Sequence, residues 1–272
     1  MELIKKIKSI EIITYDSENQ IHHAYKSKYI YAFDRQGNKT EYTSLQYISD
    51  TAESTLVNYK YSYTYNSSGN KTTEIQYLAD RSIKLRTTYS YDKHQSLIEF
   101  SQFSNSGKVE YNSKYKYNKL GKIVETSSSG MSDSVNNIST VKYIQKGKEQ
   151  YSIEEGSNFQ EIFRFDKKGT KIEHFNYYKG LLEYREEFKY DNKKLITEEL
   201  IYEPDGHLRS KELTKCDKKG NRLEYIEYDS DEVVLSKTIY YYKYDKQGNW
   251  NYKSKFVDDK LIDITLRTIT YY

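Results

Sequence analysis

The fold of this chain is decided by residues 58–77, NYKYSYTYNSSGNKTTEIQY, which combine a strict alternation with a glycine turn. Tyr59, Tyr61, Tyr63 and Tyr65 alternate with polar residues, which is the period-2 pattern of a β-strand with two unlike faces. The NSSGN that follows is typical of a tight turn, and KTTEIQY restarts a strand pattern. The stretch therefore predicts a β-hairpin.

Similar stretches recur along the whole chain, so the hairpin is one unit of an array. The residue before each turn serves as an anchor, and ten anchors can be aligned with a period near 26 residues. These anchors are Tyr15, Phe33, Tyr65, Tyr91, Tyr117, Tyr143, Phe165, Tyr190, Cys216 and Tyr244. A second, weaker turn, such as the EPDG of residues 203–206, lies between consecutive anchors. We therefore expect one all-β domain over residues 1–272, with about ten repeats and some twenty antiparallel strands in a long curled or spiralling sheet. Residues 127–140 are the poorest repeat and are expected to be irregular.

The main turns follow the pattern Asp-x-x-Gly-Asn, whose chemistry is readable residue by residue. The Asp side chain can accept a backbone N–H two residues on, which starts a type I turn. The Gly then adopts a positive φ at no steric cost and forms a bulge that restores the strand twist. We expect positive φ at Gly37, Gly69, Gly169, Gly220 and Gly248.

The composition favours an ordered protein with an unusual core. Leu, Ile, Val and Phe supply only roughly a fifth of the chain, whereas there are 32 tyrosines, whose rings pack while their hydroxyls stay in water. The 43 basic and 40 acidic residues alternate finely and leave a net charge of +3, which argues against a nucleic-acid partner. The single Cys216 excludes an intrachain disulfide, and no apolar run is long enough for a membrane-spanning helix. If Met1 is the native start we expect a cytoplasmic protein, and if an export signal was removed we expect a cell-envelope or secreted one.

The turn motifs FDRQGN, FDKKGT, CDKKGN and YDKQGN resemble the YD repeats of the Rhs-type proteins, over nearly the whole chain. The resemblance implies a continuous spiralling β-sheet, which in large members forms a hollow shell around a toxic C-terminal domain. About ten repeats are too few for such a shell, and the chain ends in LIDITLRTITYY, a strand pattern without a cargo domain. It looks more like short, stand-alone YD-repeat proteins than like the large members, and in these the motif marks a structural unit and implies no catalytic residues.

No residue pattern identifies a catalytic, cofactor or metal site. The turn aspartates Asp34, Asp92, Asp166, Asp191, Asp217 and Asp245 are spread one per turn, whereas calcium needs several converging oxygens. A second recurring set consists of glutamates that lie shortly after the turns. Cross-strand ion pairs explain them best, although two of them could instead form the carboxylate pair of a glycosidase. That set is Glu41, Glu74, Glu99, Glu125, Glu173, Glu198 and Glu224.

We therefore expect a non-enzymatic interaction protein that binds a protein or a glycan through its tyrosine-rich sheet. Kinship with Rhs-type repeats suggests an accessory or immunity partner in a polymorphic toxin system. A structural envelope protein or lipoprotein is the alternative, and a glycan-active enzyme a more remote one. The tyrosines of the YxYD positions should share one face, which either forms the core or stays partly exposed. In the second case the expected binding patch is Tyr240, Tyr242, Trp250 and Tyr252.

Overall fold

The computed structural model describes residues 6–17, 25–48, 55–130 and 137–272, and every regular element within them is a β-strand. There are twenty strands, and each pairs antiparallel with the next along the chain. They are β1 (Ile7–Asp16), β2 (Ser27–Phe33), β3 (Lys39–Ile48), β4 (Thr55–Tyr65), β5 (Lys71–Tyr77), β6 (Ile83–Tyr91), β7 (Leu97–Ser104), β8 (Val109–Tyr117), β9 (Ile123–Gly130), β10 (Asn137–Lys146), β11 (Glu149–Glu155), β12 (Phe159–Phe165), β13 (Lys171–Tyr178), β14 (Leu181–Tyr190), β15 (Ile196–Tyr202), β16 (Leu208–Cys216), β17 (Arg222–Tyr228), β18 (Val234–Tyr244), β19 (Trp250–Val257) and β20 (Lys260–Tyr271).

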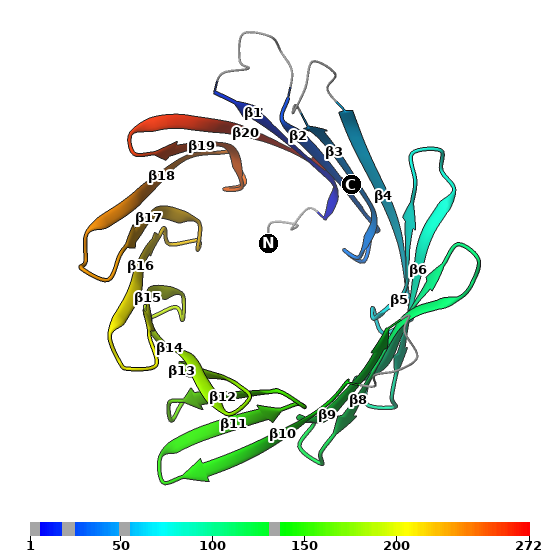
Figure 1. Ribbon diagram of the computed structural model, residues 1–272. Coiled ribbons are helices and arrows are strands. Elements are labelled where there is room, and N and C mark those ends of the chain that lie inside the picture. The colour runs from blue at the N-terminus through cyan, green and yellow to red at the C-terminus, as the bar shows by residue number, and fades with distance from the viewer. Residues whose placement is uncertain (1–5, 18–24, 49–54, 131–136) are drawn as a thin grey trace, which may run out of the picture.

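The sheet closes on itself, because the last strand pairs with the first. β20 runs antiparallel to β1 with Ile10 opposite Ile269 and Thr14 opposite Thr265, and the two threonine hydroxyls lie 3.2 Å apart. The result is the closed ring of Figure 1, in which β1 and β20 lie side by side. The all-β hairpin array is thus confirmed, but the sheet is closed rather than spiralling. No helix among the described residues is long and apolar enough to cross a membrane.

The turns have the predicted chemistry. All five predicted glycines have positive φ, between +76° at Gly248 and +96° at Gly37. In the Asp166 turn, the backbone N–H groups of Lys168 and Thr170 donate to Asp166 Oδ1 at 2.8 and 2.9 Å, and the N–H of Gly169 donates to the Asp166 carbonyl. The expected irregular segment at 127–140 was too long, because 127–130 and 137–140 belong to β9 and β10, while 131–136 lie outside the described residues.

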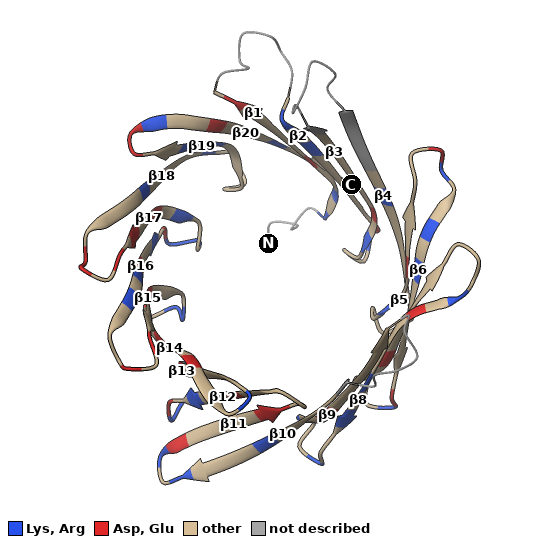
Figure 2. Ribbon diagram, in the orientation of Figure 1, with Lys and Arg blue, Asp and Glu red and all other residues tan. Residues whose placement is uncertain are grey.

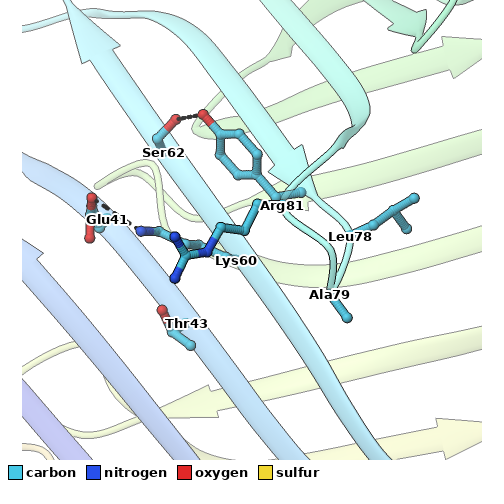
Figure 3. Close-up of a pocket in the computed structure, with 8 residues that line it drawn as sticks. Glu41, Thr43, Lys60, Ser62, Leu78, Ala79 and Arg81 are labelled. Carbon is cyan, nitrogen blue, oxygen red and sulfur yellow. Dashed lines mark hydrogen bonds and ion pairs between the residues drawn. The ribbon is translucent and has the colours of Figure 1, made fainter.

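The two faces of the sheet can be assigned to the inside and the outside of the ring. Figure 3 looks at β3 and β4 with the opposite wall behind them, and Glu41, Lys60 and Ser62 lie on the near side, which is the outer face. Alternation along β4 then places Tyr61 and Tyr63 on the inner face. Pairing from strand to strand extends this assignment around the ring. The YxYD tyrosines all lie on the inner face: Tyr63, Tyr65, Tyr89, Tyr91, Tyr115, Tyr117, Tyr190, Tyr242 and Tyr244.

The inner face replaces a conventional hydrophobic core. Phe188 is the only hydrophobic side chain among the described residues that is buried, at 7% exposure. Small inner residues are buried instead, such as Ser44, which lies between Tyr29 and Tyr59 on the neighbouring strands. A ring of this many strands is wider than its own side chains can fill. The tyrosines therefore cover the wall and remain half-buried rather than packing against a second layer.

Candidate functional site: the inner wall of the ring

Hydroxyl groups of the inner tyrosines fasten one repeat to the one before it. Tyr91 Oη donates to the carbonyl of Lys71 at 2.7 Å, and Tyr117 Oη donates to the carbonyl of Leu97 at 2.7 Å. Tyr65 and Tyr143 bond in the same way to carbonyls of the preceding repeat. In each case the accepting residue follows the turn glycine position by two. These bonds hold the tyrosine rings in place along the inner wall.

At most of the main turns a bulge brings a further residue onto this wall. Lys71 lies opposite Tyr65 after a shift in register, and its ammonium group lies 4.3 Å from the ring centre of Tyr89 and 5.6 Å from that of Tyr63. Lys39 and Lys171 occupy the same position in their own repeats and also contact two rings. Bulges commonly re-aim a side chain in this way. In these repeats, the rim of the ring nearest the main turns thus carries cations among the aromatic rings.

The aromatic patch predicted near the C-terminus is only partly assembled. Tyr240, Tyr242 and Trp250 lie on the inner face, where the rings of Tyr242 and Trp250 meet edge to face at 6.2 Å. Tyr252 lies on the outer face beneath Lys243, so the structure does not bring it together with the other three residues. The cause is the bulge between Trp250 and Tyr252, which breaks the simple alternation. Arg267, which the sequence analysis missed, lies over the Trp250 ring at 4.0 Å.

The three inner patch residues are half-buried, so they form neither a sealed core nor a freely exposed patch. Burial, followed by the neighbouring Tyr240 and Tyr244, raises the pKa of Tyr242 to about 12. Its hydroxyl donates to the carbonyl of Arg222 at 3.1 Å. Tyr242 therefore stays protonated over the physiological range and acts as a structural hydrogen-bond donor within the wall.

The glutamates predicted to form cross-strand ion pairs are paired, nearly all of them on the outer face. Lys116 and Glu125 are direct cross-strand partners at 2.6 Å, and Lys189 and Glu198 pair in the same way at 2.9 Å. The remaining pairs join Lys60 to Glu41, Lys71 to Glu74, Lys114 to Glu99, Arg164 to Glu173 and Lys237 to Glu224. Glu74 differs from the others because it lies opposite Tyr63 on the inner face and its partner Lys71 is on the same strand, so this pair is not a cross-strand one. Figure 2 shows both signs of charge distributed around the ring.

A second set of glutamates, which the sequence analysis did not identify, lies on the inner face. Glu199, Glu212 and Glu227 are direct cross-strand neighbours on β15, β16 and β17. Glu186 on β14 and Glu161 on β12 extend the set. We call these five residues the inner carboxylate row. Burial, followed by the charges of Glu186 and Glu212, raises the pKa of Glu199.

His174 on β13 lies within the inner carboxylate row. Its Nδ1 is 2.8 Å from Glu186 Oε2, and its Nε2 is 4.0 Å from Glu161 Oε2. The imidazole is held between two rings, stacked on Phe163 at 4.5 Å and edge-on to Tyr184 at 5.9 Å. It is 7% exposed, and Nε2 is buried without a hydrogen-bond partner in the part of the chain that the structure describes. Those residues contain no group of three or more His, Cys, Asp or Glu that could hold a metal ion.

The outer face carries an open cleft of about 500 Å³ between β3, β4 and the turn after β5. Figure 3 shows its lining, in which Lys60 pairs with Glu41 at 3.5 Å and the hydroxyls of Ser62 and Tyr77 lie 3.0 Å apart. Arg81 also lines this cleft. The polar groups of this cleft largely satisfy one another, so the inner wall is the stronger candidate site.

Three solved structures illustrate what the chain is similar to. A porin-like protein from Bacteroides uniformis aligns over 97% of this chain and 98% of its own, with 10% identity and a TM-score of 0.42. A porin-like protein from Bacteroides vulgatus aligns over 86% of this chain and 98% of its own, with 10% identity and a TM-score of 0.35. The TcdB2-TccC3 structure aligns over 90% of this chain but 14% of its own length, with 14% identity and a TM-score of 0.39. A scan against protein-family models finds no match, and neither does a search of curated proteins.

Proposed function

We propose that this protein is a non-enzymatic binding protein that holds part of a protein partner against the inner wall of its ring. The observation that carries the proposal is the wall itself, a continuous array of half-buried tyrosines fixed by hydrogen bonds to a closed frame. Tyr and Trp are enriched at recognition surfaces because they present a large, rigid contact area with a polar edge. A frame fixed before binding loses little conformational entropy when the partner docks.

A protein partner is favoured over a glycan by the charges on the wall. Lys39 and Lys71 lie over aromatic rings near one rim, and Glu199 and Glu212 lie side by side farther along the strands. Such a mixture of rings, cations and carboxylates complements a polypeptide, which carries apolar, acidic and basic side chains together. In its most specific form, the protein is an accessory or immunity partner in a polymorphic toxin system, for which the likeness of its turns to Rhs-type repeats is the support.

A binding role also agrees with the ion pairs that the glutamates after the turns form in the structure. Glu125 and Glu198 were candidates for a glycosidase pair, and both are held by lysines across the strand. An ion pair of this kind stabilises the sheet by a few tenths of a kcal/mol to about 1 kcal/mol. The proposal therefore assigns these carboxylates to the frame and the inner wall to the partner.

Adjacent tyrosines on opposite faces allow a direct test. Tyr240 lies on the inner wall, whereas Tyr241 lies on the outer face and is 57% exposed. A photo-crosslinking phenylalanine analogue would replace one or the other, and the protein would be irradiated in the cells that produce it. We expect a discrete protein adduct from position 240 and none above background from position 241. Equal adducts from both positions, or none from 240 and from the inner Tyr89, would overturn the proposal and favour a purely structural role.

A further inference from the structure

We infer that the inner carboxylate row is the docking site for a cationic polypeptide segment, one that presents several Lys or Arg side chains. The inference rests on the proposed function and names the chemistry of the partner that the inner wall receives. It is carried by two independent features of the wall, the arrangement of the carboxylates and the state of His174.

The carboxylates are arranged so that the folded chain compensates their charge only in part, through Lys171 near Glu199. Glu212 lies directly between Glu199 and Glu227 on adjacent strands, where side chains on one face are about 5 Å apart and like charges are destabilising. None of these three forms an ion pair with another described residue. Within the protein, the hydroxyl of Tyr225 donates to Glu227 Oε1 at 2.9 Å, which leaves the negative charges in place. A row of charges that repel one another is stabilised by an external counter-charge.

The contrast with the outer face shows that this arrangement belongs to the inner wall. Glu198, next to Glu199 on the same strand, pairs with Lys189 at 2.9 Å. Lys211, next to Glu212, points to the outer side and pairs with Glu232 at 2.9 Å. Lys189 and Lys211 on these strands therefore serve outer carboxylates, whereas Lys171, whose charge acts on Glu199, lies on the inner face over the Phe188 ring.

His174 supplies the second feature. An ionised carboxylate only accepts hydrogen bonds, so the 2.8 Å contact with Glu186 requires a proton on Nδ1 of the imidazole. In the neutral ring, Nε2 is then an acceptor, and it is buried without a donor from the described residues. A buried acceptor left unsatisfied costs about 1–3 kcal/mol. Nε2 lies 4.0 Å from Glu161 Oε2, so an N–H-bearing cation that displaces the side chains covering the neutral ring can bond to both atoms.

The dimensions fit an extended polypeptide. The row runs from β12 to β17 across strands that are about 4.8 Å apart, so its carboxylates extend over roughly 24 Å of the wall. An extended segment of about seven residues has the same length. The row is continuous with the ring-stacked Phe163 and Tyr184, which offer apolar contact to the stems of Lys or Arg side chains.

The test uses the full-length protein and two synthetic octapeptides, one of alternating Lys and Ser and one in which Gln replaces every Lys. Binding would be measured by isothermal titration calorimetry at low salt and at 0.15 M salt. The variants are the triple substitution Glu199→Gln, Glu212→Gln, Glu227→Gln and, as a matched control on the outer face of the same strand, Glu198→Gln. Removal of repelling charges should not weaken the fold, which circular dichroism and urea unfolding would verify.

We expect the Lys peptide to bind the unmodified protein and the Glu198→Gln variant equally, and the triple variant at least tenfold more weakly. The Gln peptide should not bind. Equal affinity of the triple variant and the control, binding of the Gln peptide as tight as that of the Lys peptide, or no binding of either peptide would overturn the inference. If crosslinking from Tyr240 persists in the triple variant, the proposed function stands and only the assignment of the carboxylate row fails.

Discussion

The substitution Gly169→Ala isolates the energetic cost of one turn conformation. Gly169 has φ of +78° and its N–H donates to the Asp166 carbonyl at 2.9 Å. A Cβ atom added at this position would meet nothing within 4 Å, so no steric clash with other residues contributes. The left-handed conformation costs an L-residue about 1–2 kcal/mol, while Ala reduces the entropy of the unfolded chain by about 0.4–1 kcal/mol. The net expected loss of stability is about 1 kcal/mol.

The chain offers a reciprocal substitution at the same turn position of the next repeat. Lys194 has φ of +64°, and its N–H donates to the Asp191 carbonyl at 3.0 Å. Lys194→Gly should therefore raise stability by an amount similar to the loss in Gly169→Ala. Both variants would be measured by urea unfolding with a common m-value. A Gly169→Ala variant as stable as the unmodified protein, or a Lys194→Gly variant less stable than it, would refute this account of the turns.

Three further predictions concern the wall, the carboxylate row and the closure of the ring. Tyr91→Phe removes the hydrogen bond to the Lys71 carbonyl and should cost about 1 kcal/mol in urea unfolding, whereas Tyr111→Phe, whose hydroxyl bonds to no described residue, should cost much less. The pKa of Glu199 in the folded protein lies above its ordinary value of 4.5, so its contribution to stability is full below that pH and is lost as the pH rises through the folded pKa. Glu199→Gln should accordingly raise the urea midpoint of the protein more at pH 7 than at pH 4. If the midpoints of the variant and of the unmodified protein depend on pH in the same way, this prediction is wrong. Thr14→Cys with Thr265→Cys, in a Cys216→Ser background, should form a disulfide across 251 positions and stabilise the oxidised protein by up to about 5 kcal/mol over the reduced one. Failure of these cysteines to pair would contradict the β1–β20 contact.

The sequence predicted the features of the fold that depend on local chemistry. The spacing of the Asp-x-x-Gly turns was enough to predict the strands, their number and the shared face of the YxYD tyrosines. It also predicted the ion pairs of residues such as Glu125 and Glu198, because glutamates at a fixed distance from a turn fall opposite lysines on the partner strand. Positive φ at Lys194 and Gln95 was not predicted, since these turns lack the glycine that signals it.

The features that the sequence did not predict depend on register or on long-range pairing. Closure joins β1 to β20, and no local pattern reports a pairing between the two ends of a chain. Simple alternation would place Tyr252 on the same face as Trp250, but the bulge after Trp250 adds a residue and turns Tyr252 to the outer face. The carboxylate row was missed although Glu186, Glu199 and Glu212 lie 13 residues apart, half of one repeat, because only the pairing of the strands shows that these residues share the inner face. Glu199 and Glu212 become neighbours only when the strands are folded about the turn at Pro204, and this symmetry is the signal that could have revealed them.

The pairing of β1 with β20 also constrains how the gene for such a protein can change in length. Antiparallel closure requires an even number of strands, and one repeat contributes two. Loss or duplication of a whole repeat therefore preserves closure and alters the circumference by about 10 Å, two strand spacings. An insertion or deletion of a single strand would instead bring the two terminal strands together in parallel and turn the inner face of one half outward. The diameter of such a ring can therefore change only in steps of one whole repeat.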